Sequence, residues 1–527
     1  MRWLACAGVV AFFAWSIAFF YLPGKGFTYL IGFGGKEKAR YIPEVREVNH
    51  YEAADSGGYD SQWYAQIALR PRISDPVLRR GVDSLPYRAR RILFEWTAWV
   101  LGGGRPSAVM AVFAFQNIAC WALLALLLFR WFPPTDWQNV LRWSATLFSF
   151  GLIFSVRDAL LDGPSLLVAA CGIALVESGR LWGGAIVLGI SGLGKDTSIL
   201  CGAALPPPST ARGRDWLQWV GRGIMLGLPL ALWFWYIRLR LGHGDDIGPR
   251  NFALPFAGLA NKLEDITSSL LSEPLFPLST IAKLDALVAV GLLAQFFYFA
   301  FRVRWSDLWW RVGASYAALM VFLGDAVWEN YPSAAARVLL PMALAFNISV
   351  PRRGRAWITL LVLGNLGIFA SMNLLKPPGR ESYEVYGPKE LRINPKDGST
   401  VAAVFGAKNW WDPERSRWTY FRWSLGDSSI ALHNPLPFPI VADIKFSLRA
   451  VERRDAVISL SGKEIRREHL RPAQVEPVTL TGVRLAPGDT FLGFGSNRPP
   501  AFPGNGDPRR LTYMVRNFEI DVTGRAP

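Results

Sequence analysis

Long runs of apolar residues recur along the chain and stop at Lys376. A helical run of about 20 apolar residues is long enough to cross the hydrocarbon of a bilayer. The first run, Trp3–Leu22, has no small-x-small cleavage site after it, which favours a membrane anchor over a signal peptide. The further apolar runs are 108–129, 140–156, 164–178, 181–205, 216–241, 283–301, 307–328, 333–350 and 356–375. The pattern predicts a mainly α, polytopic transmembrane helical bundle over residues 1–376.

The run 181–205 contains the charge pair Lys195-Asp196, which would be costly at the middle of a bilayer. Two short spans that meet at this pair on the outer side avoid that cost and give about 11 spans in all. With a cytoplasmic N-terminus, the split also places Arg302, Arg304 and the cluster Arg352–Arg355 inside, as the positive-inside rule requires.

This topology makes residues 23–107 the first outer loop. Within it, Pro86–Leu101 has a short apolar stretch that includes Glu95, and it is too short to span. We expect this segment, and a second helix that begins near Ser61, to lie at the membrane interface.

The pattern changes after Pro377-Pro378-Gly379, which we take as a domain boundary. Residues 380–527 contain stretches that alternate between apolar and polar positions, separated by Pro, Gly and Asn turn signals. The clearest are Ile440–Leu448, Asp455–Leu460 and Val478–Leu485. Alternation with period 2 is typical of half-buried strands, so the sequence predicts a C-terminal all-β sandwich domain. In the topology above this domain is extracytoplasmic.

Composition agrees with a membrane protein: 51% of the residues are hydrophobic and the net charge is +16. In a soluble protein such a charge would suggest nucleic acid, but here Arg and Lys gather at the ends of apolar runs. We therefore expect contact with membrane lipid and no nucleic acid. With four histidines and no CxxC or HxxxH spacing, a structural zinc site is not expected. A divalent cation could bind Asp245-Asp246, although such a pair is more often a solvated loop.

Charged residues predicted to lie near the outer face form a set with a possible chemical use. A carboxylate there can take a proton from a hydroxyl, and Arg or Lys can hold a phosphate. Together they suit a transferase whose donor is a lipid phosphate; the alternative is that they are ordinary interfacial charges facing water. The set includes Asp55, Asp60, Asp158, Asp162, Lys195, Asp196 and Arg337.

The segment Gly58–Leu69 (GYDSQWYAQIAL) reads as an amphipathic helix from Ser61 onward, with Trp63, Tyr64 and Ile67 facing lipid. Asp60 precedes this helix, at the position of an N-cap. Its carboxylate therefore has two explanations, a helix cap or a base held at the membrane surface.

Several stretches resemble, in order, motifs of the GT-C superfamily of integral membrane glycosyltransferases. Tyr59–Ala68 (YDSQWYAQIA) resembles the WD-x-x-WY-x-x-IA pattern of the first outer loop of the mannosyltransferase branch, and YDGQFYY-x-x-A in bacterial relatives. The other stretches similar to elements of those relatives are Tyr87–Leu93 (YRARRIL), Arg157–Pro164 (RDALLDGP), Gly194–Thr197 (GKDT) and Ala336–Pro341 (ARVLLP). The resemblance covers residues 1–375 and does not extend to the β domain.

The resemblance implies an inverting hexosyl- or pentosyltransferase that uses a polyprenyl-phosphate sugar and an envelope glycan or lipid acceptor. It would work at the outer face of a bacterial inner membrane. By this implication Asp60 is the general base, and either Asp158 or Asp162 supports the acceptor or the base.

The same resemblance implies that Lys195 and Arg337 hold the donor phosphate. The further residues expected at the substrates are Asp55, Gln62, Tyr64 and Asp196. Tyr59 stands where the mannosyltransferase branch has Trp, and Lys195-Asp196 replaces Arg-Glu, which leaves the identity of the sugar open.

Two other classes of function fit the composition. A transporter or flippase for lipid-linked sugars could use the same charges along a path, but it should show internal repeats and charges near mid-bilayer. A non-catalytic envelope assembly protein could use the β domain to bind a partner.

Overall fold

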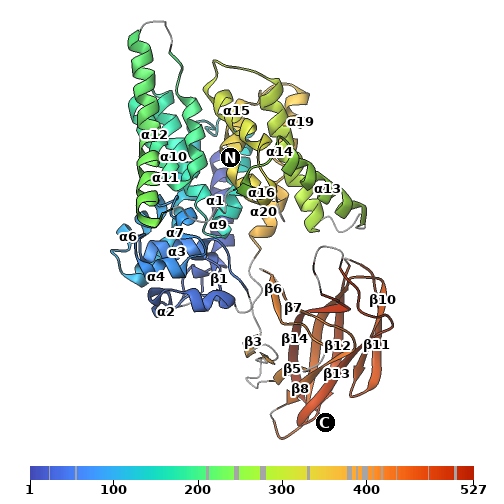
Figure 1. The fold of residues 1–527 in the computed structure, drawn as a ribbon. Coiled ribbons are helices and arrows are strands. Elements are labelled where there is room, and N and C mark those ends of the chain that lie inside the picture. The colour runs from blue at the N-terminus through green and yellow to red at the C-terminus, as the bar shows by residue number, and fades with distance from the viewer. Residues whose placement is uncertain are drawn as a thin grey trace. The chain divides into compact units, whose positions relative to one another are not determined.

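The computed structural model divides the chain into two compact units, Met1–Glu52 with Gly58–Pro377, and Ala53–Gly57 with Pro378–Pro527. The first is mainly helical and the second is built of strands (Figure 1). The residues that the structure describes are 1–22, 24–53, 56–208, 213–242, 249–272, 280–328, 333–376, 383–386, 390–393, 401–406, 409–416, 419–434, 436–472, 474–503, 507 and 509–526.

Helices of very different length make up the first unit, because several of the apolar runs are broken. The α-helices are α1 (Arg2–Ala18), α2 (Pro43–Glu47), α3 (Ser61–Leu69), α4 (Pro76–Gly81), α5 (Leu85–Arg88), α6 (Leu93–Leu101), α7 (Pro106–Leu128), α8 (Trp137–Leu147), α9 (Phe150–Arg157), α10 (Asp162–Glu177), α11 (Leu181–Gly194), α12 (Gly213–Leu241), α13 (Ala257–Ser272), α14 (Ile281–Phe301), α15 (Leu308–Val321), α16 (Asp325–Trp328), α17 (Ser333–Val338), α18 (Leu340–Ser349), α19 (Arg355–Gly364) and α20 (Ile368–Leu374). The shorter elements are the 3-10 helices η1 (Thr28–Leu30), η2 (Gly35–Arg40), η3 (Asp196–Ala204) and η4 (Pro249–Asn251), and the paired strands β1 (Phe33–Gly34) and β2 (Glu52–Ala53).

Four helical segments among the described residues are long and apolar enough to cross a membrane. They are α7, α12, α14 and the segment Arg355–Leu374, which holds α19 and α20. The pair α8 and α9 would add a fifth span if it is counted as one, although it bends by 44° at its break. The expected count of about 11 spans is therefore not confirmed. The run 181–205 does break where its charges stand: α11 ends at Gly194, and η3 begins at Asp196.

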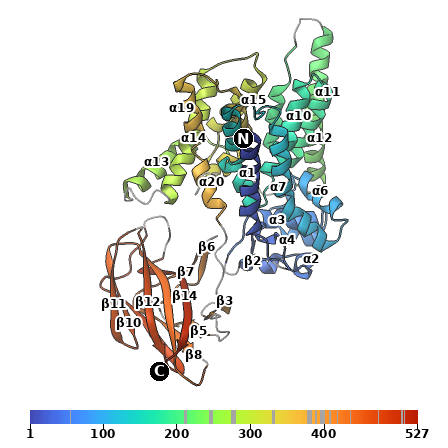
Figure 2. The ribbon, with the colours of Figure 1, turned by 180° about the vertical axis from the view of Figure 1, so that it is seen from behind.

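The helices α10, α11 and α12 lie side by side in both views of the ribbon (Figures 1 and 2). Small residues allow this close approach, since a Cβ at Gly172 would come within 2.7 Å of the Leu188 side chain. At Gly189 a Cβ would meet the Met225 carbonyl oxygen at 2.7 Å. The C-terminal end of α11, where Lys195 follows, is thus fixed by packing on both sides.

The short helix α3 is buried along its whole length, which corrects the prediction of a lipid-facing side. Trp63 and Ile67 belong to an apolar cluster with residues of the 73–92 segment and with Ile237 and Leu241 of α12. The Tyr64 side chain is also buried. Protein, not lipid, covers the apolar face, because the 73–92 segment and the end of α12 pack against it.

The second unit consists of two antiparallel sheets. Their strands are β3 (Tyr383–Tyr386), β4 (Glu390–Ile393), β5 (Val401–Phe405), β6 (Glu414–Ser416), β7 (Thr419–Trp423), β8 (Ser428–Asn434), β9 (Ile440–Ala450), β10 (Arg454–Leu460), β11 (Lys463–Leu470), β12 (Val475–Leu485), β13 (Gly488–Ser496) and β14 (Tyr513–Arg525). The strand orders are β11-β10-β13-β8-β5-β4-β3 and β12-β9-β14-β7-β6.

Both sheets of the second unit contribute to one hydrophobic core. Ile430 and Ile458 come from the seven-stranded sheet, and Ile444 and Leu448 come from the five-stranded sheet. In β9 every second residue is buried, so the alternation seen in the sequence does fill this core. The predicted strands 440–448, 455–460 and 478–485 are confirmed as β9, β10 and β12.

Candidate functional site

The helix α3 is positioned by its own buried glutamines. The Gln62 side-chain oxygen accepts a hydrogen bond from the Gly34 N–H at 3.2 Å, and the Gln66 side-chain oxygen accepts one from the Ile42 N–H at 3.0 Å. These bonds satisfy backbone groups of the loop that covers the helix, so they fix where α3 begins. Gln62 was expected at the substrate, but its amide oxygen is used here to hold the loop.

Asp60, directly before α3, makes no side-chain hydrogen bond that caps the helix. Its carboxylate instead accepts a hydrogen bond from Arg88 Nη2 at 3.0 Å, and the same guanidinium binds Asp83 at 2.7 Å. The Asp60 side chain is 41% exposed, so water reaches a carboxylate that is held in place on one side. The cap explanation is therefore not supported for Asp60.

Burial raises the pKa of Asp60, but the charges of Arg88, Arg337 and Arg91 outweigh it and hold the pKa below the ordinary value of an aspartate. The carboxylate is thus ionised at neutral pH. It can accept a proton, although the nearby cations favour its charged form and so make protonation less favourable.

Arg91 and Tyr64 form the next contact. Arg91 Nη1 donates to the Tyr64 hydroxyl at 2.9 Å, and Arg91 Nη2 lies 3.7 Å from an Asp196 oxygen. Arg88 Nη1 reaches the same hydroxyl at 3.5 Å. These residues form one part of a charged cluster, whose other part is buried and is described next. We call Asp60, Asp83, Arg88, Arg91 and Asp196 the open half of the cluster, because its carboxylates are all partly exposed.

Asp162, Lys195 and Arg337 form a buried triad. Lys195 Nζ binds one oxygen of Asp162, and Arg337 Nη1 binds the other oxygen at 3.0 Å. The Asp162, Lys195 and Arg337 side chains are 4%, 8% and 9% exposed, respectively. The three residues come from the start of α10, the end of α11 and α17, so the triad ties α17 to two consecutive helices that are far from it in sequence.

Packing of α9 against α17 positions Arg337, the member of the triad that also acts on Asp60 of the open half. A Cβ at Gly151 would lie 2.3 Å from the Ala336 carbonyl oxygen, so the two backbones touch there. The Arg337 guanidinium lies over the Phe154 ring and acts electrostatically on Asp60. One cluster therefore contains Asp60, Tyr64, Asp162, Lys195, Asp196 and Arg337 of the expected site residues.

The remaining expected residues are Gln62, which holds the covering loop as described above, Asp158 and Asp55. Asp158 is buried at the end of α9, where the nearby Leu160 carbonyl accepts hydrogen bonds from Asn117 and Ser155. Asp55 lies outside the described residues. Asp245-Asp246, considered above for a cation, also lies outside them, and the described part of the chain contains no group of three His, Cys, Asp or Glu side chains that could hold a metal ion.

Asp83, Arg88 and Arg91 are the cluster residues that the sequence did not single out. The stretch Tyr87–Leu93 contains both arginines and was noted as similar to a family element, but neither arginine received a role. That similarity was the available signal. Their part in the site depends on tertiary contacts with Asp60 and Tyr64, which no local pattern predicts.

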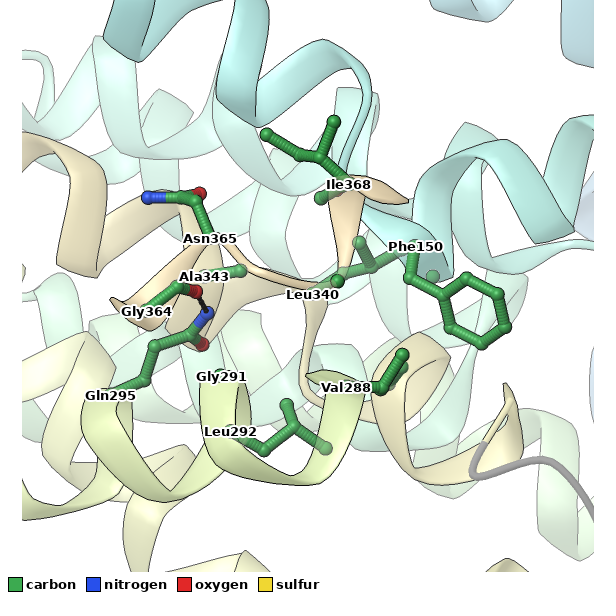
Figure 3. A pocket seen from close by; sticks show the side chains of 14 residues that line it. Phe150, Val288, Gly291, Leu292, Gln295, Leu340, Ala343, Gly364, Asn365 and Ile368 are labelled. Atoms are coloured by element: carbon green, nitrogen blue, oxygen red, sulfur yellow. Dashed lines mark hydrogen bonds between the residues drawn. The ribbon is translucent and has the colours of Figure 1, made fainter. Parts of the chain in front are cut away.

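A mostly apolar pocket lies elsewhere in the helical unit, between α9, α14, α18 and the α19–α20 segment (Figure 3). The only side-chain bond drawn across it runs from Gln295 Nε2 to the Gly364 carbonyl, at 2.7 Å. Asn365 supplies a second amide to its wall, and no residue of its lining is ionisable. The pocket therefore contributes no acid–base group, although Ala336 of its wall directly precedes Arg337.

No model of a known protein family and no curated protein matches the chain. Among solved structures, the chain is similar to the cryo-EM structure of the arabinosyltransferase EmbB from Mycobacterium smegmatis, with 11% sequence identity and a TM-score of 0.27. The match covers 98% of this chain and 64% of that one, so this chain spans less than two thirds of that protein. A likeness at this TM-score says nothing about activity, and the functional assignment rests on the cluster itself.

Proposed function

We propose that this protein is an integral membrane glycosyltransferase that moves a hexose or pentose from a polyprenyl-phosphate donor to an envelope glycan or lipid acceptor. It would act at the outer face of a bacterial inner membrane, with the β unit extracytoplasmic. The observation that carries this proposal is the position of Asp60, a partly exposed carboxylate that binds Arg88 and lies within the electrostatic influence of Arg337 and Arg91.

The chemistry needs a proton acceptor beside a positively charged anion site. Asp60 takes the proton of the acceptor hydroxyl while that oxygen forms a bond to the anomeric carbon of the sugar. The bond from this carbon to the phosphate oxygen breaks, and prenyl phosphate leaves with the electron pair. Cations beside the leaving group stabilise the charge that develops on it. Asp162 orients two of these cations, Lys195 and Arg337, as a positioning residue.

The membrane character of the helical unit supports a lipid-borne donor. Four candidate spans belong to the unit that holds the cluster. The alternative of a transporter lacks a feature to support it, since the charges described above gather in one cluster instead of being spread along a path.

The test is an Asp60→Asn variant of the full chain in membranes, assayed for prenyl phosphate release from a panel of prenyl-phosphate-linked hexoses and pentoses, with envelope extract as acceptor. General-base catalysis contributes about 10²- to 10⁴-fold, and we expect a loss of that order. Asp75→Asn is the matched control, because Asp75 lies in the same outer segment but pairs with Arg70 and caps α4. Transfer by Asp60→Asn at the rate of the control, or no release from any donor by the native chain, would contradict the proposal.

A further inference from the structure

The cations of the buried triad are both bound to the same carboxylate. Lys195 and Arg337 occupy both oxygens of Asp162, and all three side chains are less than a tenth exposed. An anion that approached either cation would have to break a buried, charge-assisted bridge, which is among the costlier contacts to lose. The triad is therefore poorly suited to be the first contact of an incoming phosphate.

Arg91 has unused hydrogen-bonding capacity. Of its five N–H donors, the one to the Tyr64 hydroxyl makes its only hydrogen bond within the described part of the chain. Its Nε is buried and has no hydrogen-bond partner among these residues. The distance of 3.7 Å to Asp196 is an ion-pair contact and not a hydrogen bond. At 17% exposed, the Arg91 side chain can still be reached from solvent.

The surroundings of Arg91 add positive potential. Arg88 and Arg91 both donate to the buried Tyr64 hydroxyl, which holds the two guanidinium groups close together. Glu95 follows one turn later, but burial raises the pKa of its carboxyl well above the ordinary value, so it does not neutralise Arg91.

We propose that Arg91 forms the primary binding site for a phosphate group, with positive potential added by Arg88, and that Asp162, Lys195 and Arg337 are positioning residues. This inference rests on the proposed function and assigns its anion site to residues outside the expected pair. The planar guanidinium fork of Arg91 matches two phosphate oxygens, which a point charge does not. The phosphate is carried by a lipid in the proposed function, and free phosphate would offer the same chemistry.

The experiment measures equilibrium binding of geranyl phosphate, geraniol and inorganic phosphate to the full chain in lipid nanodiscs. The variants are Arg91→Ala, Arg91→Lys and the matched control Arg90→Ala. Arg90 is the adjacent arginine, and it lies over the Tyr87 and Phe234 rings. We expect Arg91→Ala to weaken geranyl phosphate binding by about tenfold or more, since one bidentate contact of this kind is worth at least 1.4 kcal/mol.

Arg91→Lys should bind geranyl phosphate with intermediate affinity, because it keeps the charge and loses the fork. If Arg91→Ala fails to fold, the affinity of Arg91→Lys for geranyl phosphate tests the assignment in its place. Geraniol binding should be equal in all variants. Equal affinity of Arg91→Lys, Arg90→Ala and the native chain for geranyl phosphate would overturn the assignment. Inorganic phosphate that binds as tightly as geranyl phosphate would overturn the lipid source.

These outcomes are separate from those of the proposed function. If geranyl phosphate binding depends on Arg91 while Asp60→Asn transfers sugar normally, the anion site stands and the assigned catalysis fails. If Asp60→Asn abolishes transfer while Arg91 variants bind normally, the catalysis stands and the anion site fails.

Discussion

The buried triad and the open half of the cluster use the same types of side chain in opposite ways. In the triad, one carboxylate serves two cations, and water has little access. In the open half, Arg88 serves two carboxylates, Asp60 and Asp83, and Arg91 makes a single hydrogen bond to the residues that the structure describes. The difference indicates that the triad fixes the geometry of three helices, whereas the open half leaves charged groups accessible to solvent.

The largest effect should come from the triad. Asp162→Asn leaves Lys195 and Arg337 buried without a counter-charge, and we expect it to lower the free energy of unfolding by about 3–5 kcal/mol. Thermal and denaturant unfolding of the detergent-purified protein would measure this. Asp136→Asn, which removes the cap of α8, is the control and should cost about 1 kcal/mol. An Asp162→Asn variant that is as stable as this control would mean that the triad does not contribute to the stability of the fold.

Arg88 should have the next largest effect. Arg88→Gln removes charged hydrogen bonds from Asp60 and Asp83, at a cost of about 1.5–3 kcal/mol in stability. Because the lost cation stabilised the ionised form of Asp60, the pKa of this carboxyl should rise. The acid limb of the pH profile of transfer should therefore move to higher pH. Arg90→Gln serves as the control, and an acid limb that does not move relative to it would separate Asp60 from the base role.

Glu95 is a buried carboxyl group that, unlike Asp162, binds no cation in the described part of the chain. Its oxygens have no hydrogen-bond partner in the described part of the chain, and burial raises its pKa. The unfolded state releases this proton first, so the native protein loses stability as the pH rises above about 4.3, by at most about 1.4 kcal/mol per pH unit. Glu95→Gln should match the native chain near pH 4 and be more stable than it at pH 8. A destabilised variant at pH 8 would show that the carboxylate is charged and partnered.

The smallest expected effect is the contribution of the ionised Asp60 carboxylate to the free energy of unfolding. Its lowered pKa means that the ionised form stabilises the fold above the ordinary aspartate range, and that this contribution disappears as the pH falls through the folded value. Because the side chain is 41% exposed, solvent screening should limit the contribution to less than about 1 kcal/mol. Unfolding curves of the native chain and Asp60→Asn at pH 7 and pH 3 would measure it. The variant should lose slightly less stability on acidification than the native chain.

Much of the fold could be predicted, because buried apolar residues recur along the sequence with the period of the helix or strand. The alternation in 440–448 located β9, and the charge pair at Lys195 located the end of α11. The breaks within apolar runs were harder to predict. The run 333–350 divides into α17 and α18 around Leu339, and Pro341 in the first turn of α18 was the signal that could have shown this. The bend between α8 and α9 has no comparable signal in the sequence.

The candidate site could be predicted in part. Spacing located Asp60, Lys195 and Arg337, because charges beside apolar runs stand out in a sequence. It did not locate Arg88 and Arg91, since arginines in an interfacial segment are common and their partners are set by tertiary contacts. The buried position of Trp63 was missed for the same reason: an apolar helical face does not state whether lipid or protein covers it.

The contact at Gly151 has a consequence for redesign. This residue carries no chemistry, yet its lack of bulk determines where a guanidinium comes to rest, because the peptide that leads into Arg337 touches it. A methyl group there would push α17 outward and carry Arg337 with it, while every charge stayed the same. Position 151 therefore sets the place of Arg337 by steric contact alone, and a substitution there would shift this cation without changing any ionisable residue.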